Sequence, residues 1–143
     1  MINEWKSHLI GAKITEIHRI CNLISFHFKL GKKFTYLHVQ SFVRILQKDN
    51  VIISSEDIYK CGKNVTEENF EWDLPDSSIF DDCIKEHLEK LCNAAVTEIK
   101  ESANGDLTIN FENAICMQIL IDTTETEEMY RIFDDINSTE VTS

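Results

Sequence analysis

Hydrophobic and polar residues alternate most regularly between Val96 and Asp122, which predicts three antiparallel strands joined by two tight turns. The first turn is Ala103-Asn104-Gly105, where Gly105 can adopt the left-handed conformation at little cost. The second turn is Glu112-Asn113-Ala114. With these turns one face of the sheet is apolar, and it carries Ile99, Leu107, Ile109, Phe111, Ile115, Met117, Ile119 and Ile121.

The same turns predict the register of these strands, because a slip of one residue would mix the apolar and polar faces. Between the first two strands the expected pairs are Thr97 with Phe111, Ile99 with Ile109, and Glu101 with Leu107. Between the second and third strands they are Phe111 with Ile115, Ile109 with Met117, and Leu107 with Ile119.

The N-terminal half shows a similar pattern. Its expected strands are Ala12–Ile20, Leu23–Leu30, Lys33–Gln40, Phe42–Gln47 and Val51–Ser54. The second and third of these form a hairpin around Gly31-Lys32, in which Phe26 faces Leu37 and Ile24 faces Val39. The opposite face of that hairpin carries Ser25, His27, Tyr36 and His38.

Short stretches of the two halves are alike, which indicates an internal repeat. Ala12-Lys13-Ile14-Thr15-Glu16-Ile17 matches Ala95-Val96-Thr97-Glu98-Ile99 with one residue skipped, and Val43-Arg44-Ile45 matches Tyr130-Arg131-Ile132. We therefore interpret each half as a three-stranded meander followed by a short strand that carries an arginine.

Two helices are expected. Residues 3–10 form a short helix that begins at Asn3 and ends before Gly11. Ser78 begins a longer helix, with Asp81 three residues later as a variant capping box. Apolar residues recur at helical spacing from there through Cys92, so one stripe of this helix faces the core.

Together these elements predict an α+β fold. It consists of two antiparallel β-meanders that share a core, a short N-terminal helix, and one amphipathic helix between the halves. We expect residues 1–143 to form a single domain. The meander halves lie at 12–54 and 95–133, the acidic loop and helix at 55–93, and a frayed tail at 137–143.

Composition narrows the possible functions. Apolar residues make up 43% of the chain, which excludes wholesale disorder, and the N-terminus lacks the uninterrupted apolar core of a signal peptide. We expect a cytoplasmic protein without a membrane span. The net charge of −11 argues against direct binding to nucleic acid, and it suits either plain solubility or an acidic surface for a basic partner.

Five cysteines fit a reducing compartment, because their number is odd and no CxxC motif occurs. Cys83 and Cys92 fall nine residues apart in the expected helix, about 14 Å along its axis, which is too far for a disulfide. We expect buried free thiols, with no zinc site and no cofactor.

The polar face of the first hairpin is one place where chemistry could occur. His27, His38 and Ser25 share that face and could form a small hydrolase site or a metal site. A serine nucleophile also needs an acidic group that orients the base and an oxyanion hole, and a catalytic metal needs a third ligand. Neither requirement is met within the hairpin itself, so we favour a packed or solvated polar face and a protein that is not an enzyme.

The acidic segment between the halves is the other candidate. It combines aromatic residues with six candidate contact residues: Glu67, Glu68, Glu71, Trp72, Asp73 and Asp76. An aromatic anchor surrounded by steering charge is typical of interface hot spots. Trp72 could equally serve only to fasten the loop to the core. A second acidic cluster contains Glu125, Glu127 and Glu128.

Two longer motifs resemble a known family. They are Leu37-His38-Val39-Gln40 followed by Val43-Arg44-Ile45, and Asp122-Thr123-Thr124 followed by Glu127-Glu128 and Tyr130-Arg131-Ile132-Phe133. At these motifs the chain resembles small bacterial immunity proteins of contact-dependent growth inhibition and other polymorphic toxin systems. The family tends to have Trp before each arginine and Gly in the second meander turn, where this chain has Val43, Tyr130 and Ala114.

The resemblance implies that the protein neutralises one cognate toxin domain, commonly a nuclease, by stoichiometric binding. It also implies a structural role for Arg44 and Arg131, each buried against a carboxylate. A nuclease presents a basic face to its substrate, so an acidic protein can occupy that face by charge complementarity. The alternative remains a small hydrolase or metal-dependent enzyme that uses His27, His38 and Ser25.

Overall fold

The computed structural model describes residues 4–124, 129–134 and 140–142, and their strands form two five-stranded antiparallel sheets. Sheet A has the order β1-β2-β3-β9-β10, with the bounds Lys13–Ile20, Leu23–Leu30, Lys33–Val39, Tyr130–Asp134 and Glu140–Thr142. Sheet B has the order β5-β4-β8-β7-β6, with the bounds Asn50–Ser54, Phe42–Gln47, Ile115–Leu120, Leu107–Phe111 and Val96–Glu101. The predicted α+β class is confirmed.

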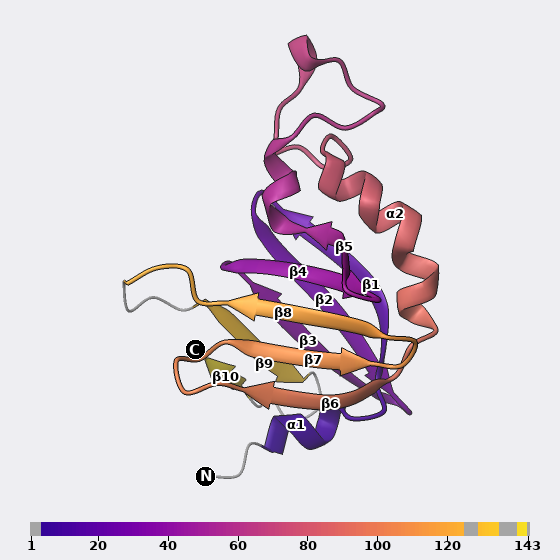
Figure 1. Cartoon of the computed structure of the whole chain (residues 1–143), viewed down its shortest axis with the longest axis vertical. Helices are drawn as coiled ribbons and strands as arrows, with labels where there is room; N and C mark the ends of the chain where they lie inside the picture. Colours follow the sequence, from indigo (N-terminus) through magenta and orange to yellow (C-terminus); the bar gives the residue numbers. More distant parts are fainter. Residues whose placement is uncertain (1–3, 125–128, 135–139, 143) are drawn as a thin grey trace.

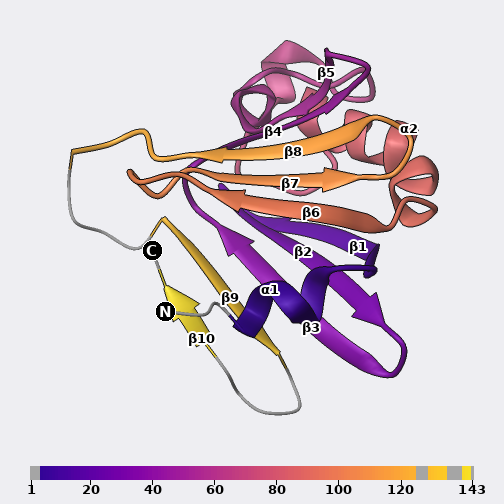
Figure 2. The ribbon, with the colours of Figure 1, turned by 60° about the horizontal axis from the view of Figure 1, so that its bottom comes forward.

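The sheets lie over each other as two layers, with the helices at the borders of the sandwich (Figures 1 and 2). The short helix α1 (Glu4–Leu9) packs against β2 and buries Trp5 and Leu9. The longer helix α2 (Ile79–Cys92) packs against β1 and β5. Two 3₁₀ helices, η1 (Ser55–Tyr59) and η2 (Glu67–Asn69), lie in the segment that connects β5 to α2.

The two halves of the chain exchange their fourth strands. Strands β1 to β3 form one meander and β6 to β8 form the other, each in its own sheet. Strand β4 leaves the first half and pairs with β8, whereas β9 leaves the second half and pairs with β3. In the same registers Arg44 stands opposite Gln118, and Arg131 stands opposite His38. The exchange ties the halves together, because each sheet is completed by the other half's strand.

The core lies between the two sheets. Phe28 of sheet A and Phe111 of sheet B stack across the interface, with ring centroids 6.3 Å apart. Alternate residues of the central strands are buried on both sides of this contact, as the period-two pattern requires. The most deeply buried side chains include Phe26, Phe28, Leu37, Ile45, Leu107, Ile109, Met117, Ile119 and Tyr130.

Most predicted registers are confirmed. Phe26 pairs with Leu37, Ile99 with Ile109, Glu101 with Leu107, Ile109 with Met117, and Leu107 with Ile119. The pairing of Thr97 with Phe111 is wrong, because a register shift between Val96 and Glu98 places Val96 opposite Phe111. The extra residue at this position is a β-bulge, which a two-residue alternation does not reveal.

Three further predictions concern the N-terminal cap of α2, the C-terminal tail and the start of the first helix. The predicted capping box is present, since Asp81 accepts hydrogen bonds from the Ser78 amide while Ser78 Oγ accepts one from the Asp81 amide. The predicted frayed tail is wrong for residues 140–142, which form β10 against β9. The predicted helix start at Asn3 lies outside the described residues.

Candidate functional site

The outer face of sheet A gathers the polar residues that the first hairpin was expected to present. Ser25 and His27 project from β2, and the register places Ser25 opposite His38 of β3. On the other side of β2, a register shift between Ile14 and Glu16 changes the alternation of β1. As a result Glu16 stands directly opposite His27, and His18 stands opposite Ser25.

Four side chains from β1 and β2 are in contact at this point. Glu16 Oε2 lies 3.2 Å from His27 Nδ1 and 3.7 Å from His18 Nε2. The other ring nitrogen of His27, Nε2, lies 3.1 Å from Ser25 Oγ. The His18 and His27 rings are 5.1 Å apart between centroids. We call Glu16, His18 and His27 the Glu–His cluster.

Sequence reasoning found Ser25 and His27 but missed Glu16 and His18. It looked for further groups within the hairpin, whereas they come from the preceding strand. The alternation of Glu16, His18 and Ile20 in the sequence does indicate a shared face. Only the pairing of β1 with β2 shows that this face is also that of His27.

The hydrogen-bonded order Ser25, His27, Glu16 has the arrangement of a nucleophile, a base and an acidic group that orients the base. Acyl transfer also needs donors for the oxyanion. Ser25 is the third residue of β2 and pairs with His18 of β1 and His38 of β3, so the described backbone around it is engaged in the sheet. The described geometry therefore suits a hydrolase less well than a cluster of metal ligands.

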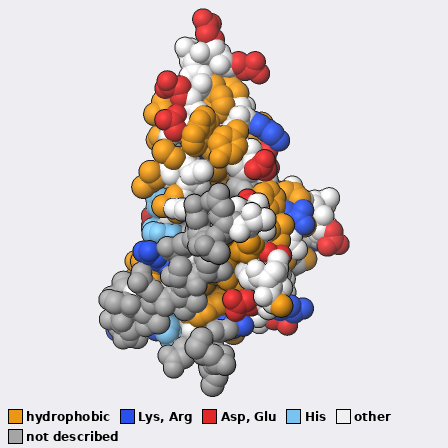
Figure 3. Space-filling model, turned by 90° about the vertical axis from the view of Figure 1, so that its left-hand side faces the viewer, with side chains coloured by type: hydrophobic (Ala, Val, Ile, Leu, Met, Phe, Trp, Pro, Cys, Tyr) orange, Lys and Arg blue, Asp and Glu red, His pale blue; other side chains and the backbone are white. Residues whose placement is uncertain are grey.

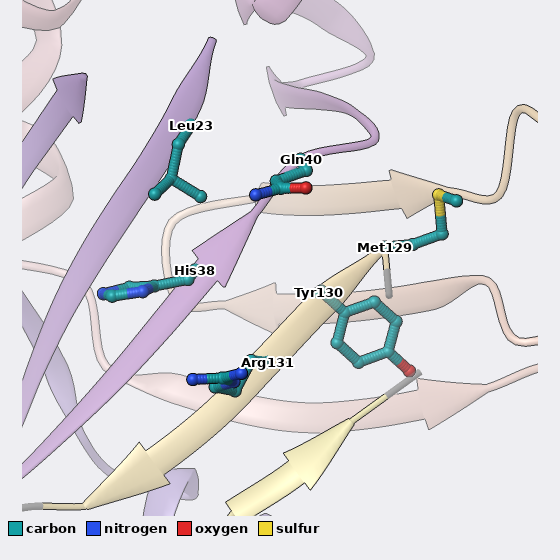
Figure 4. A pocket seen from close by; sticks show the side chains of 6 residues that line it. All are labelled: Leu23, His38, Gln40, Met129, Tyr130 and Arg131. Atoms are coloured by element: carbon teal, nitrogen blue, oxygen red, sulfur yellow. The ribbon is translucent and has the colours of Figure 1, made fainter. Parts of the chain in front are cut away.

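A chain of ring contacts continues from His27 across sheet A. His27 meets Tyr36 edge-on at 4.9 Å, Tyr36 meets Phe133 at 5.4 Å, and His38 meets Phe133 edge-on at 4.9 Å. Near the end of these strands a hollow of about 180 Å³ is lined by Leu23, His38, Gln40, Met129, Tyr130 and Arg131. Figure 4 shows His38 and Arg131 projecting to the same side of their adjacent strands, away from the Tyr130 ring.

The acidic segment forms a separate structure, which projects beyond one end of both sheets (Figure 1). An isolated bridge between Cys61 and Ser78 closes its base. Gly62 fits into that base, where a Cβ would approach the Ser77 and Ser78 carbonyl oxygens to 2.9 Å. The acidic segment is therefore attached to the body of the protein at its base.

Arg19 of β1 is the main anchor of the loop. Its guanidinium donates to the carbonyl oxygens of Trp72 and Leu74 at 2.8 Å each. It also forms a two-pronged ion pair with Asp81, in which Nε and Nη2 donate to the two carboxylate oxygens at 2.7 Å each. Only 3% of the Arg19 side chain is exposed. One arginine thus joins a strand, a helix cap and the loop, and the sequence analysis did not identify it.

The ionisation of Asp81 reflects this environment. Burial by itself raises the pKa of the carboxyl, but the hydrogen bonds from Arg19 and Ser78 favour the charged form more strongly. The pKa of Asp81 therefore lies below its ordinary value. Asp81 serves the capping box and the ion pair at once, so its charge supports both α2 and the loop.

All six candidate contact residues of the loop are exposed, as a binding surface requires: Glu67, Glu68, Glu71, Trp72, Asp73 and Asp76. The second acidic cluster, Glu125, Glu127 and Glu128, lies outside the described residues. Trp72 contacts the Tyr59 ring at 5.1 Å, and both side chains stay well exposed, as does Leu74. Figure 3 shows hydrophobic side chains gathered at this end of the molecule with acidic side chains around them.

Trp72 is attached to the rest of the molecule and is also partly exposed. Its carbonyl oxygen is held by Arg19, and its ring packs on Tyr59. Yet 38% of the residue remains accessible, so the ring is not a core residue. Ile20, at the end of β1, is 74% exposed and lies with His18 on the outer face of sheet A.

The expected role of the repeat arginines is wrong for Arg44. Its Nε donates to the amide oxygen of Gln118 at 2.7 Å, so its partner is not a carboxylate, and the residue is only half-buried. Arg131 is also half-buried, opposite His38. Arg19, which lies outside the repeat motifs, has a buried side chain bound to a carboxylate, that of Asp81.

The five cysteines are free thiols, as predicted. Partial burial raises the pKa of the thiols of Cys83, Cys92 and Cys116, which lowers their reactivity. Cys21 is exposed and the other four are half-buried, so the prediction of buried thiols is wrong for Cys21 and only partly met by the others.

Comparisons of the chain with family models, with curated proteins and with solved structures give no match. In the described residues, no helix has the length and apolar character needed to cross a bilayer. The resemblance to immunity proteins thus stays a hypothesis drawn from short motifs.

Proposed function

We propose that this protein is a cytoplasmic immunity protein that binds a basic toxin domain and neutralises it without catalysis. The proposed contact surface, which we call the loop face, consists of Glu67, Glu68, Glu71, Trp72, Asp73 and Asp76. The cluster of Glu125, Glu127 and Glu128 is proposed as a second contact.

The observation that carries this proposal is the combination of exposed aromatic surface and exposed carboxylates on one anchored loop. Trp72 and Tyr59 offer apolar area that a partner can bury, and aromatic residues are enriched in interface hot spots. The hydrogen bonds from Arg19 hold the loop in one conformation before binding. A preorganised loop loses less conformational entropy when it binds, which favours affinity.

Charge supports the same partner class. The net charge of −11 and the acidic residues of the loop face would attract a basic surface and raise the rate of association. A nuclease domain has such a surface because it must bind phosphates. The motifs that resemble immunity proteins suggest the same partner, with a secreted toxin of a neighbouring gene as the specific candidate.

The test is binding to the C-terminal domain of such a neighbouring toxin. The variant Glu68→Lys/Glu71→Lys/Asp73→Lys reverses three charges of the loop face. We expect a slower association rate with weaker dependence on salt, measured by surface plasmon resonance at several ionic strengths. Unchanged affinity and salt dependence would exclude the loop face as the contact surface.

A matched control carries the same change in net charge on other exposed positions. Glu86 and Glu89 lie on α2 and Glu98 on β6, and all three are exposed. The variant Glu86→Lys/Glu89→Lys/Glu98→Lys is expected to keep most of the affinity. Equal loss in both variants would mean that only total charge matters and that no specific acidic surface exists.

The apolar contribution is tested separately with Trp72→Ala. As an interface anchor, Trp72 should account for about 2–4 kcal/mol of binding free energy, mainly through faster dissociation. Thermal unfolding of the same variant shows whether the loop remains folded. Toxin protection of cells that is intact with Trp72→Ala would contradict the role of this ring.

A further inference from the structure

We propose that Glu16, His18 and His27, the Glu–His cluster, bind a divalent transition metal ion of the Zn²⁺ type. The ligand atoms are Glu16 Oε2, His18 Nε2 and His27 Nδ1. Imidazole nitrogen with one carboxylate oxygen is a ligand set that zinc uses in proteins. The site lies on the outer face of sheet A and is independent of the proposed toxin contact.

The distances between ligand atoms agree with a shared metal. Two ligands of a tetrahedral zinc ion lie about 3.3–3.5 Å apart, given bond lengths of about 2.0–2.2 Å. The Glu16 oxygen lies 3.2 Å from the His27 nitrogen and 3.7 Å from the His18 nitrogen. All three ligand atoms lie within 4.8 Å of one another. Small side-chain rotations are enough to bring them around one ion.

The neighbours of His27 also hold its ring in the way expected for a metal ligand. Its Nε2 faces Ser25 Oγ at 3.1 Å, so a proton on Nε2 can be donated to the serine while the Nδ1 lone pair points to the metal. The Tyr36 ring packs edge-on against the imidazole at 4.9 Å and limits its rotation. Only 22% of the His27 side chain is exposed, whereas Glu16 and His18 are each 59% exposed.

The backbone that presents the three ligands is regular on one strand and bulged on the other. The register shift before Glu16 puts that residue and His18 on the outer face, against His27 of β2. Bulges often re-aim side chains next to functional sites. Because both strands belong to a five-stranded sheet, the distance between the ligands is set by the sheet and not by a loop.

Three protein ligands leave at least one coordination position open. Beside the cluster lies a mostly apolar hollow of about 210 Å³, whose walls include His18, Ile20, Leu23, Ser25, His27 and His38. Figure 3 shows histidine side chains, in pale blue, gathered on this side of the molecule. Because His18 and His27 are ligands and also line this hollow, water or a small ligand with a nitrogen or oxygen donor in the hollow would be close to the ion.

The test is calorimetric titration of the chelator-treated full chain with ZnCl₂. One equivalent should bind, and the dissociation constant should rise at least about tenfold in Glu16→Gln, His18→Ala and His27→Ala, since even the loss of a supporting residue costs about 10–100-fold. His87→Ala removes a histidine of α2 that lies outside the cluster and its hollow, and it should bind zinc like the parent protein. Circular dichroism of each variant verifies that the sheet is intact.

Five free thiols could also bind zinc, so the ligand class needs its own measurement. Co²⁺ substituted at the site should give the visible absorption of a nitrogen and oxygen site without a thiolate charge-transfer band. No stoichiometric binding, binding that the three variants leave unchanged, or a thiolate band would each overturn the proposal. None of these outcomes depends on whether a toxin binds to the loop face.

Discussion

The two sheets contribute alike to the core but differ in the chemistry of their outer faces. Each contains one meander plus the exchanged strand of the other half, and each buries alternate apolar residues. On sheet B the outer polar groups pair locally across strands, as in Arg44 with Gln118 and Asn110 with Glu98. On sheet A they form the Glu–His cluster. The acidic loop is held by Arg19 of β1, whose side chain is buried and which stands opposite Ile24, so it does not belong to the outer face. A repeated topology thus supplies two scaffolds, and among the described residues the candidate metal ligands and the anchor of the acidic loop belong to sheet A.

The strongest test of the shared core is the pair of stacked phenylalanines. Phe28→Ala and Phe111→Ala should each lower the free energy of unfolding by about 3–5 kcal/mol, because both leave a cavity between the sheets. Denaturant unfolding of the single and double variants measures the cost. We expect similar single effects and a coupling between them, since the rings contact each other. A large cost on one sheet only would show that the sheets do not share one core.

Substitution of Arg19 tests the ion pair that distinguishes sheet A from sheet B. Arg19→Met removes the cationic partner of a buried ion pair and leaves the Asp81 carboxylate with only its hydrogen bonds from Ser77 and Ser78, which should cost about 3–5 kcal/mol. The loop also loses the donors to the Trp72 and Leu74 carbonyl oxygens, so proteolysis within residues 60–78 should become faster. Limited proteolysis and denaturant unfolding report the two effects. A stability near that of the parent protein would remove Arg19 as the anchor.

The same ion pair predicts an acid dependence of stability. The pKa of Asp81 is lower in the folded protein than in the unfolded chain, so its stabilising contribution is complete above the unfolded pKa of about 3.9. The contribution is lost as the pH falls through the lower, folded pKa. Unfolding of the parent protein and Asp81→Asn between about pH 2 and 7 should show a stability gap that narrows in acid. A gap that is constant with pH would mean that the charge of Asp81 does not matter.

The smallest change in the free energy of unfolding is expected for a substitution on sheet B. Arg44→Met breaks one half-buried hydrogen bond to the Gln118 amide, which has other access to solvent, so the cost should be about 0.5–1.5 kcal/mol. Unfolding measured beside Arg19→Met gives the comparison directly. If Arg44→Met were as destabilising as Arg19→Met, the contrast between the arginines of the two sheets would be wrong.

Local patterns were sufficient for much of the fold. Alternation and turn residues predicted the hairpin of β2 and β3 and most of the β6–β8 meander with their registers, because a tight turn determines which residues can pair. The capping box of α2 was equally local, since Ser78 and Asp81 are three residues apart. The candidate residues of the loop face could be named for the same reason, because exposed charges and aromatics in a polar segment are visible in the sequence.

What the sequence by itself determined, then, is the set of elements and their faces, whereas the tertiary structure decided which distant elements meet. The exchange of β4 and β9, the ion pair between Arg19 and Asp81, and the meeting of Glu16 with His27 are such contacts. A single bulge in β1 brings Glu16 and His18 to the face of His27, and alternation alone does not place it. The physical reason is the sequence separation over which each interaction acts. Turns and caps depend on residues a few positions apart, whereas the pairing of strands that are far apart in the sequence depends on the burial of the whole core.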